Sequence, residues 1–546
     1  MPSTPHPSVA ARGPRAADDA PSFALRGMHL NGWAFGYPYT FRCWHEADWQ
    51  RYADMLAAQG CNLFFIWPFM EIMPVPLSTA DRAYLAEVRR VVEYAQRRHG
   101  MEVWIMQSAN RVALNDCGVR DPRLRPYWVL KPQGDHAKAG QVDLDPADPQ
   151  QFARIMRARE TLYRMLANAN GFCTIDSDPG GWAQSPLGDL MKIFKASRRL
   201  LDRLSVHGTQ TKLIHWLWSG WGQPGWWTRT WRRQDMHQFM CQTIRAMKRE
   251  LPEPWRLIVG RQEYLPACVA ERVLGKTVYL PYNTIEGEPS RPGTQLNFAL
   301  QRKSLDAAAC CAGLAGLMGN VQTPLLQLPH VGFFLNAAMH FDSRNQSPRK
   351  ILRALAAEVY PQHQELLADC WMALLPAGRA DAGRLARRLA RLVAQDRLGR
   401  LGRLGQLLFP DQRQIARDLT WQLKAWAAFE ALRRALCRRA PKPRCARCVE
   451  AFLAAALAWD GQHGWSAYWR TLGTAWTLWP VYDPAYPSIV RGLVRLLRGA
   501  KAGDKAVAAF LAPIERRLAR RYDAWIVAQC GIEPIRKAIQ EAQCRC

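Results

Sequence analysis

Eight short apolar runs recur between residues 23 and 342, and most of them are followed by a segment whose apolar positions have helical spacing. The runs lie at 24–32, 62–67, 101–106, 171–175, 211–218, 255–259, 277–280 and 312–318. Their apolar residues are continuous rather than alternating, which is typical of parallel strands buried on both faces. Eight such strands separated by helices predict an α/β protein with a closed (β/α)8 barrel, the TIM-barrel fold.

Helix signals support this alternation. A helix is predicted over 46–59, and a second one begins with a capping box formed by Ser78 and Asp81 and ends at Gly100. A long loop follows the third run, and a third helix is predicted over 149–168. The alternative, an open doubly wound sheet, usually carries a glycine-rich phosphate loop after an early strand. No such loop motif occurs in the chain, which favours the barrel.

The pattern changes after residue 342. Residues 343–546 lack strand-like runs and are dominated by Leu, Ala and Arg at helical spacing, which predicts an all-α domain after the barrel at 23–342. Residues 1–22 lack the apolar core of a secretory signal and are predicted to form a disordered tail. No run of apolar residues is long enough for a transmembrane helix. The arginine-rich segment 384–403 fits a membrane-surface helix or, more commonly, a solvated basic face above buried leucines.

The chain is strongly basic. Its 546 residues include 74 Lys and Arg against 46 Asp and Glu, a formal net charge of +28. Arginine supplies 60 of the 74 basic residues, a bias that a GC-rich bacterial genome produces without any selection for an acidic partner. No zinc finger, RNA-recognition signature or basic zipper accompanies the charge, so nucleic-acid binding is not the favoured function.

The 15 cysteines are odd in number and scattered along the chain. Scattered cysteines in a chain with a large core predict reduced thiols in a cytoplasmic protein. Cys445 and Cys448 have the spacing of zinc ligands, but no second pair or paired histidines accompany them. We therefore interpret them as free thiols and predict no metal and no cofactor.

Residues with chemical potential collect directly after the predicted strands. The carboxyl ends of the strands and the loops that follow them build the active site of a (β/α)8 barrel. Acids, amides and tryptophans recur at these positions, and such a lining suits a polyhydroxylated ligand because indole faces pack against sugar C–H faces while amides and charged groups bind hydroxyls. The candidate substrate-binding residues are His29, Asn31, Trp33, Trp67, Asn110, Arg111, Trp182, Trp218, Trp221, Asn283, Asn320 and Gln322.

Asp176 and Asp178, which follow the fourth run, are the leading catalytic candidates. Hydrolysis of a glycoside needs two carboxyl groups, one of which must be protonated. Residues i and i+2 of a strand share a face, and two carboxyl groups held close together have pKa values that move apart. A helix cap or a brace for the next turn is the structural alternative. The candidate partner acids are Glu263 and Glu286, and Glu71 is a weaker one.

Three segments carry a resemblance to known enzymes: RGMHLNGW at 26–33, TIDSDPGGW at 174–182 and GNVQTP at 319–324. Residues 23–342 resemble the hexosaminidase-like and α-glucuronidase-like barrels of the retaining glycosidases. In the hexosaminidase-like group, adjacent acids after the fourth strand support substrate-assisted catalysis, whereas Ser177 separates the two acids here. The α-glucuronidase-like arrangement implies a fourth-strand acid with later carboxylates, which matches Asp178, Glu263 and Glu286.

Together these features predict a glycoside hydrolase for an oligosaccharide or glycoconjugate, with an acidic or an N-acetylated sugar as candidate substrates. Asp178 would be the general acid, Asp176 the residue that tunes or positions it, and Glu286 or Glu263 the nucleophile or base. One alternative is a catalytically silent sugar-binding or scaffold protein whose basic helical domain binds a partner. Another is a basic nucleic-acid or membrane-surface protein that uses residues 384–403. The metalloprotease motif HExxH and the esterase motif GxSxG are absent.

Overall fold

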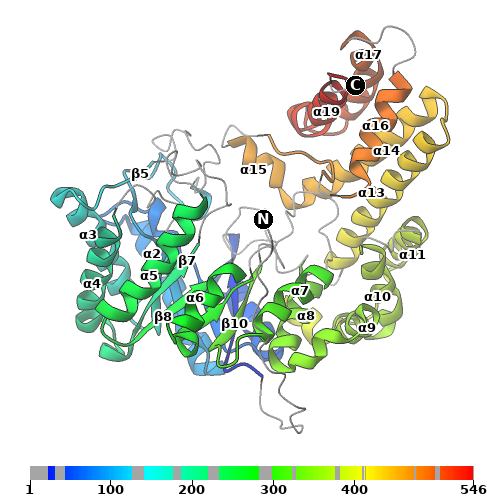
Figure 1. The fold of residues 1–546 in the computed structure, drawn as a ribbon. Helices are drawn as coiled ribbons and strands as arrows, with labels where there is room; N and C mark the ends of the chain where they lie inside the picture. Colours follow the sequence, from blue (N-terminus) through cyan, green and yellow to red (C-terminus); the bar gives the residue numbers. More distant parts are fainter. Residues whose placement is uncertain are drawn as a thin grey trace, which may run out of the picture.

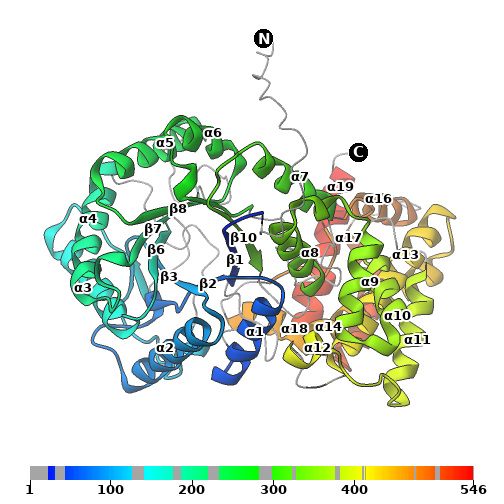
Figure 2. The same cartoon turned by 90° about the horizontal axis from the view of Figure 1, so that it is seen from below.

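Eight parallel strands close into a barrel, which confirms the predicted TIM-barrel fold. The computed structural model describes residues 22–30, 43–125, 140–175, 186–218, 233–281, 298–321, 327–375, 381–408, 411, 413–471, 475–481, 483–497 and 504–544. The barrel strands are β1 (Leu25–Leu30), β2 (Leu63–Ile66), β3 (Glu102–Ser108), β6 (Gly171–Ile175), β7 (Lys212–Leu217), β8 (Trp255–Val259), β9 (Thr277–Tyr279) and β10 (Gly316–Val321). They pair in the order β1-β10-β9-β8-β7-β6-β3-β2, and β1 closes the ring on β2 (Figure 2).

Two details of the strand prediction were wrong. The apolar run 312–318 begins in a turn, where Gly313 has a φ of 90°, so the eighth strand starts only at Gly316 and includes Asn320. The loop predicted after the third run contains two further strands, β4 (Arg111–Ala113) and β5 (Gln141–Asp143), which pair antiparallel. Both strands are only three residues long, which is too short for a recognisable hydrophobic alternation.

A layer of helices surrounds the barrel, as Figure 2 shows. These helices are α1 (Glu46–Ala58), α2 (Thr79–His99), α3 (Pro149–Met165), α4 (Leu187–Leu204), α5 (Arg233–Glu250), α6 (Leu265–Ala270), α7 (Phe298–Ala309) and α8 (Leu328–Met339). The predicted capping box of α2 is present, because the Ser78 hydroxyl accepts a hydrogen bond from the backbone N–H of Asp81 and the Asp81 carboxylate accepts one from the N–H of Ser78. Gly100 ends this helix in the left-handed conformation.

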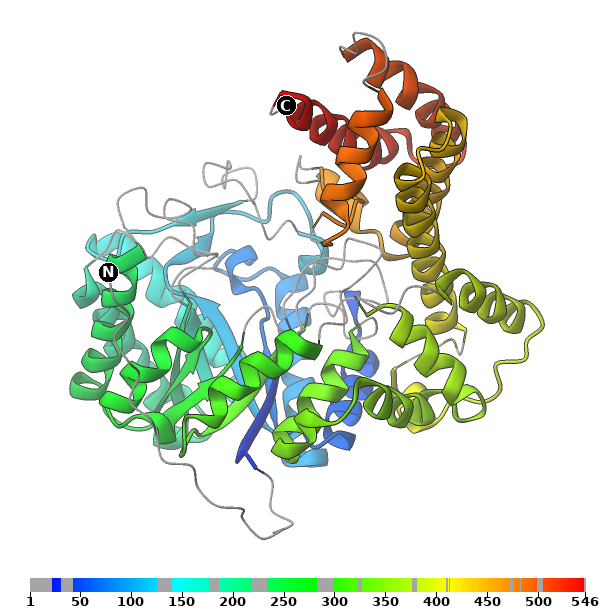
Figure 3. The same ribbon diagram turned by 45° about the vertical axis from the view of Figure 1, so that its right-hand side comes forward.

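The described residues after the barrel are helical. They form α9 (Pro348–Val359), α10 (Gln364–Ala373), α11 (Ala382–Ala394), α12 (Arg403–Leu408), α13 (Gln414–Cys437), α14 (Lys442–His463), α15 (Trp465–Thr471), α16 (Tyr486–Leu497), α17 (Asp504–Ala519), α18 (Ala524–Ile526) and α19 (Glu533–Cys544). Figures 1 and 3 show the long α13 and α14 rising beside the barrel and carrying α16, α17 and α19 beyond its upper end. Across the described ranges, no helix combines the length and the apolar character that crossing a membrane requires.

The cysteine pair at the start of α14 is described in full. Cys445 is buried and its thiol donates to the Ala440 carbonyl oxygen at 3.6 Å, while Cys448 is half-buried. Burial raises the pKa of both thiols. No group of three potential metal ligands occurs within the part of the chain that the structure describes. Both cysteines therefore lie near the start of α14, where burial disfavours the thiolate form.

Gly316 makes the closure of the barrel tight. It pairs with Leu25 where β10 meets β1, and a Cβ atom added to it would run into the Leu25 backbone carbonyl oxygen. We predict that Gly316→Ala lowers the free energy of unfolding by about 1–3 kcal/mol, because the two strands must separate to make room. Gly188→Ala in α4 is the control, since a Cβ there contacts nothing within 4 Å. Urea unfolding followed by circular dichroism measures both, and equal stability of the two variants contradicts this account of closure.

A buried carboxyl group lies at the end of α14. The Asp460 carboxylate accepts hydrogen bonds from the backbone N–H and the hydroxyl of Ser466, at 3.2 and 2.9 Å. Burial outweighs these two contacts and raises the pKa of Asp460 to about 6. Because the folded pKa lies above the ordinary value, the folded protein holds a proton that the unfolded chain releases between pH 4 and pH 6. Stability from this group is therefore present at low pH and is lost as the pH rises through about 6.

We predict that Asp460→Asn removes this loss. The wild-type free energy of unfolding should fall by about 2 kcal/mol more than that of the variant when the pH is raised from 4 to 7. The measurement is urea unfolding of both proteins at the two pH values. A variant with the same pH dependence as the wild type would show that folding does not raise the pKa of Asp460.

Candidate active site

His29 of β1 lies at the centre of the barrel. Its ring centroid is 4.8 Å from that of Phe65 on β2 and 5.1 Å from that of Trp216 on β7. β1 and β7 are on opposite sides of the ring of strands, so side chains that touch between them must point into the interior. Because side chains alternate along a strand, this contact identifies which residues of each strand face inward.

The inward-facing side chains of β1 and β10 are polar near the carboxyl ends of these two strands. His29 pairs in register with Asn320, and both side chains are fully buried. Burial lowers the pKa of His29 to about 3, and the Phe65 backbone offsets only part of this effect. Neither ring nitrogen makes a hydrogen bond of normal geometry with a described residue. A neutral imidazole both donates and accepts one hydrogen bond, which is the pairing that a hydroxyl group offers.

Trp67 and Glu71 form a second polar corner, just past β2. Phe69 has a left-handed φ of 58° and stacks on Trp67 at 5.0 Å, which turns the chain so that Glu71 comes back beneath the indole. The Trp67 Nε1–H donates to Glu71 Oε2 at 3.1 Å, and the backbone N–H of Ser108 at the end of β3 donates to Oε1. Burial raises the pKa of Glu71 against these hydrogen bonds and the nearby Arg111. The sequence ranked Glu71 low, because a lone acid five residues past the end of a strand carries no signal of burial.

Trp218 lies on the inward side of β7, beside Trp216 at 5.8 Å. Gly260, which follows β8, faces both rings, and a Cβ atom there would lie 3.1 Å from Trp216 Nε1 and from Trp218 Cε3. The absence of a side chain at Gly260 therefore lets the two indoles occupy the mouth of the barrel. Trp67 and Trp218 are the predicted tryptophans that the described part of the structure brings to this end of the strands.

Asn110 and Arg111 have partners within the protein. Arg111 Nε and Nη2 donate to the two carboxylate oxygens of Asp143 at 2.7 and 2.8 Å, which ties β4 to β5. The Asn110 amide donates to the Leu144 carbonyl oxygen at 2.9 Å. In this structure the Arg111 side chain therefore joins β4 to β5, and the Asn110 side chain binds the backbone just after β5.

Glu263 lies apart from the barrel interior. It is in the short 3-10 helix η6 (Gln262–Tyr264), its side chain is 39% exposed, and its carboxylate is 3.3 Å from Arg261. Its charge also raises the pKa of Tyr279 on β9, second to burial. Tyr279 pairs with Val259, the neighbour of the inward Gly260, so Tyr279 faces the helical layer. The carboxyl group of Glu263 is thus close to Tyr279, a side chain that faces the helical layer.

The remaining predicted site residues lie outside the described residues. These are Asn31, Trp33, Asp176, Asp178, Trp182, Trp221, Asn283, Glu286 and Gln322. β6 is described up to Ile175, the residue that precedes the first of the two aspartates.

The sequence matches no protein-family model and no curated protein sequence. Among solved structures, the chain is similar to a GH138 enzyme that targets pectin rhamnogalacturonan II, with 10% identity, 96% of this chain and 84% of that chain covered, and a TM-score of 0.47. A Thermobaculum terrenum O-GlcNAc hydrolase gives 10% identity, 91% and 98% coverage and a TM-score of 0.43. A GH20 exo-β-N-acetylglucosaminidase from Vibrio harveyi gives 12% identity, with 61% of this chain and 58% of that chain covered and a TM-score of 0.35. The strand pairing, rather than these similarities, establishes the barrel.

A buried cation lies behind the upper ends of β3 and β6. Arg159 of α3 is 2% exposed, and its Nη1 donates to the Thr174 hydroxyl at 3.0 Å. Its Nη2 donates to the carbonyl oxygens of Ser108 and Ala109 at 2.9 and 3.0 Å. No carboxylate of the described residues is within ion-pairing distance of this guanidinium. The end of β6 therefore lies in a positive field that is little screened by water.

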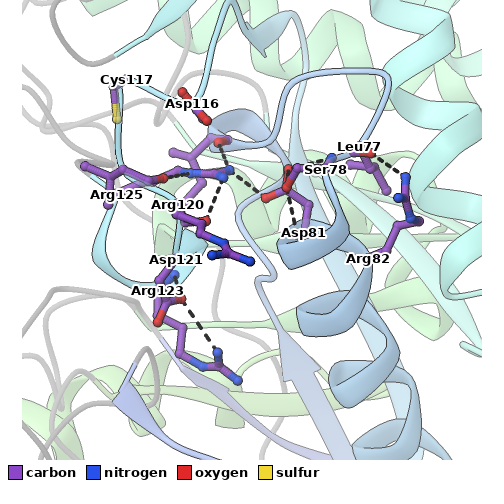
Figure 4. Close-up of polar contacts among 12 residues, drawn as sticks. Leu77, Ser78, Asp81, Arg82, Asp116, Cys117, Arg120, Asp121, Arg123 and Arg125 are labelled. Carbon is purple, nitrogen blue, oxygen red and sulfur yellow. Dashed lines mark hydrogen bonds and ion pairs between the residues drawn. The ribbon is translucent and has the colours of Figure 1, made fainter.

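A buried ion pair anchors the turn that carries Glu71. Figure 4 shows Arg125 enclosed by the chain between Asp116 and Asp121 on one side and the start of α2 on the other. Its Nη1 is 2.6 Å from Asp81 Oδ1 and donates to the Ile72 carbonyl oxygen at 2.9 Å. Both charged side chains are at most 1% exposed. Because Ile72 directly follows Glu71, this pair fixes the backbone on one side of the buried acid.

We predict that Arg125→Met lowers the free energy of unfolding by about 3–5 kcal/mol, because it leaves the Asp81 carboxylate buried without its partner. Adding Asp81→Leu should recover part of the loss, since the unpaired charge is then gone. The control is Arg82→Met, next to Asp81 on α2, whose guanidinium donates hydrogen bonds to Thr79 and to the Leu77 carbonyl oxygen among the described residues. The measurement is urea unfolding, and an Arg125→Met variant as stable as the control would contradict the role of the pair.

Proposed function

We propose that the protein is a glycoside hydrolase that acts on an oligosaccharide or glycoconjugate. The observation that carries the proposal is the chemistry gathered at the carboxyl end of the barrel. A neutral imidazole, an amide, indole rings and a buried carboxyl group converge there from β1, β10, β7 and the turn after β2. Binding sites for small polar ligands combine aromatic walls with a few fixed polar groups in this way, and barrel enzymes place them at this end.

The catalytic roles rest on positions in the sequence. Asp178 is the proposed general acid, Asp176 the residue that tunes it, and Glu286 or Glu263 the nucleophile or base. Support comes from β6, which ends at Ile175, so the Asp-Ser-Asp motif begins where barrel enzymes carry their chemistry. Of the two partner acids, Glu286 is the stronger proposal, because Glu263 is paired with Arg261 and lies toward the helical layer.

Arg159 supports an unequal pair of acids. Its Nη1 is 3.0 Å from the Thr174 hydroxyl, and Asp176 follows Thr174 by only two residues along the chain. A fixed positive charge favours the ionised form of the carboxyl group nearest to it and lowers its pKa. The anion so stabilised raises the pKa of a second carboxyl group close by, which is the condition that a general acid needs at neutral pH.

The mouth also supplies binding groups for the sugar. The proposed substrate-binding residues are His29, Asn31, Trp33, Trp67, Asn110, Arg111, Trp182, Trp218, Trp221, Asn283, Asn320 and Gln322. Glu71 adds a positioning role, because its carboxylate accepts the Trp67 indole N–H and holds that ring at the end of β2. The candidate substrates are acidic sugars, which suit the net charge of +28, and N-acetylated sugars, whose acetamido group matches amide and imidazole partners.

We predict that the protein releases 4-nitrophenol from one member of a panel of aryl glycosides that includes the glucuronide and the N-acetylglucosaminide. Asp178→Asn should lower kcat on a methyl glycoside of the same sugar by about 100-fold or more, because a poor leaving group needs a proton from the general acid. The loss on the 4-nitrophenyl glycoside should be smaller, since 4-nitrophenolate leaves readily without one.

The control variant is Asp306→Asn, whose side chain is 60% exposed on α7 and pairs with Arg344. Equal losses on both leaving groups would remove the role of Asp178 as general acid while leaving the hydrolase in place. Sugar binding by calorimetry without turnover of any glycoside would instead support the catalytically silent sugar-binding protein.

A further inference from the structure

A surface groove lies in the C-terminal helices, away from the strands of the barrel. It runs between α14 and α17, is closed at one side by the end of α16, and has a volume of about 760 Å³. Its walls carry both apolar and charged side chains. They are Lys442, Pro443, Ala446, Arg447, Glu450, Leu497, Ala506, Ala509, Phe510, Pro513, Ile514 and Arg517.

The α17 wall of the groove has the spacing of a helix-packing face. Ala506, Ala509, Phe510, Pro513 and Ile514 fall at i, i+3, i+4, i+7 and i+8, which is one stripe of an α-helix. In a helical bundle, such a stripe is covered by a neighbouring helix. Here Phe510 stays half-buried and Ala509 exposed, so part of the stripe faces solvent.

The length of the stripe suits a short helix. The α17 wall runs from Ala506 to Arg517, which is 12 residues, and at about 1.5 Å per residue it is roughly 18 Å long, a little over three helical turns. The small side chains Ala446 and Ala509 on the two walls leave room for apolar side chains of an incoming helix. An amphipathic helix laid in an apolar groove is a recurrent mode of peptide recognition.

The charged side chains on the walls indicate the sign of the charge that a bound partner should carry. Arg517 binds both carboxylate oxygens of Glu450, through contacts of 2.9 to 3.1 Å, so this acid is neutralised within the groove. Lys442 and Arg447 are exposed on α14 and have no acidic partner within ion-pairing distance among the residues that the structure describes. The groove therefore presents an apolar floor and a net positive edge.

We propose that this groove docks an amphipathic helix with acidic flanks from a partner protein. The apolar face of that helix would cover Phe510 and Pro513, which are both half-buried, and its acidic side chains would meet Lys442 and Arg447. The inference does not depend on the chemistry of the barrel, because none of these residues is at the ends of the strands.

The test uses the full-length protein and a fluorescein-labelled 18-residue peptide with leucines at i, i+3, i+4 and i+7 and glutamates on its other faces. Fluorescence anisotropy should show saturable binding that weakens about tenfold with the double variant Lys442→Glu/Arg447→Glu. Ala509→Trp, which fills the groove, should weaken binding by at least about tenfold, a loss of 1.4 kcal/mol. The affinity should also fall as salt is added, since exposed charges are screened.

The matched control is Ala153→Trp, which places the same large ring on an exposed alanine of another surface groove, on α3. This variant should bind the peptide like the wild type. Equal binding of a scrambled peptide, or of a version with lysine in place of glutamate, would overturn the proposal. It would also be overturned if sedimentation velocity shows a dimer that Ala509→Trp converts to a monomer, because the occupant would then be a second copy of this chain.

Discussion

Closure of the barrel is the constraint on which the site depends. The pairing of β1 with both β10 and β2 fixes the register of the whole ring, and through it the side of each strand that faces inward. The contact between His29 and Trp216 spans the barrel from one side to the other, so it exists only because the ring is closed. Shifting one strand by a single residue would move its inward side chains to the helical layer.

The mouth above this core is stabilised by buried polar groups rather than by apolar packing alone. Glu71 receives two hydrogen bonds, and Arg159 and Arg125 each donate to backbone carbonyl oxygens as well as to side chains. Leaving any one of these groups unsatisfied would cost several kcal/mol, whereas a complete set fixes the strand ends in one arrangement. A site that must hold a sugar in one orientation needs this kind of rigid support.

The sequence predicted most of the barrel and part of the mouth. All eight strands were found because continuous apolar runs are a local signal. The positions of His29, Trp218 and Asn320 at the carboxyl ends of their strands followed from their places in or just after those runs. The strands β4 and β5 were missed because three residues are too few to show a hydrophobic alternation. The start of β10 at Gly316 was missed because the turn at Gly313 lies within a continuous apolar run.

The buried arginines that hold the strand ends and turns at the mouth of the barrel could not be predicted, for a different reason. Arg125 and Asp81 are 44 residues apart, and Arg159 reaches Ser108 across 51 residues. In neither pair does the sequence around one residue indicate which residue it will contact in the folded chain. Glu263 shows a related limit, because its position just past a strand is a local signal, whereas its place in the 3-10 helix η6 beside Arg261 is visible only in the folded chain.

The C-terminal helices show the same limit in another form. α11 and α17 are both amphipathic, alanine-rich helices with arginine in the last turn, although α17 also contains Phe510 and an internal Pro513. α13 covers the apolar stripe of α11, so Leu385 and Leu389 are buried and its arginines point to solvent. The stripe of α17 is covered only in part, and Phe510 is left at the floor of a groove with a basic edge. An amphipathic pattern therefore predicts that a helix needs a partner, but only the packing of the folded chain reveals whether the chain itself supplies it.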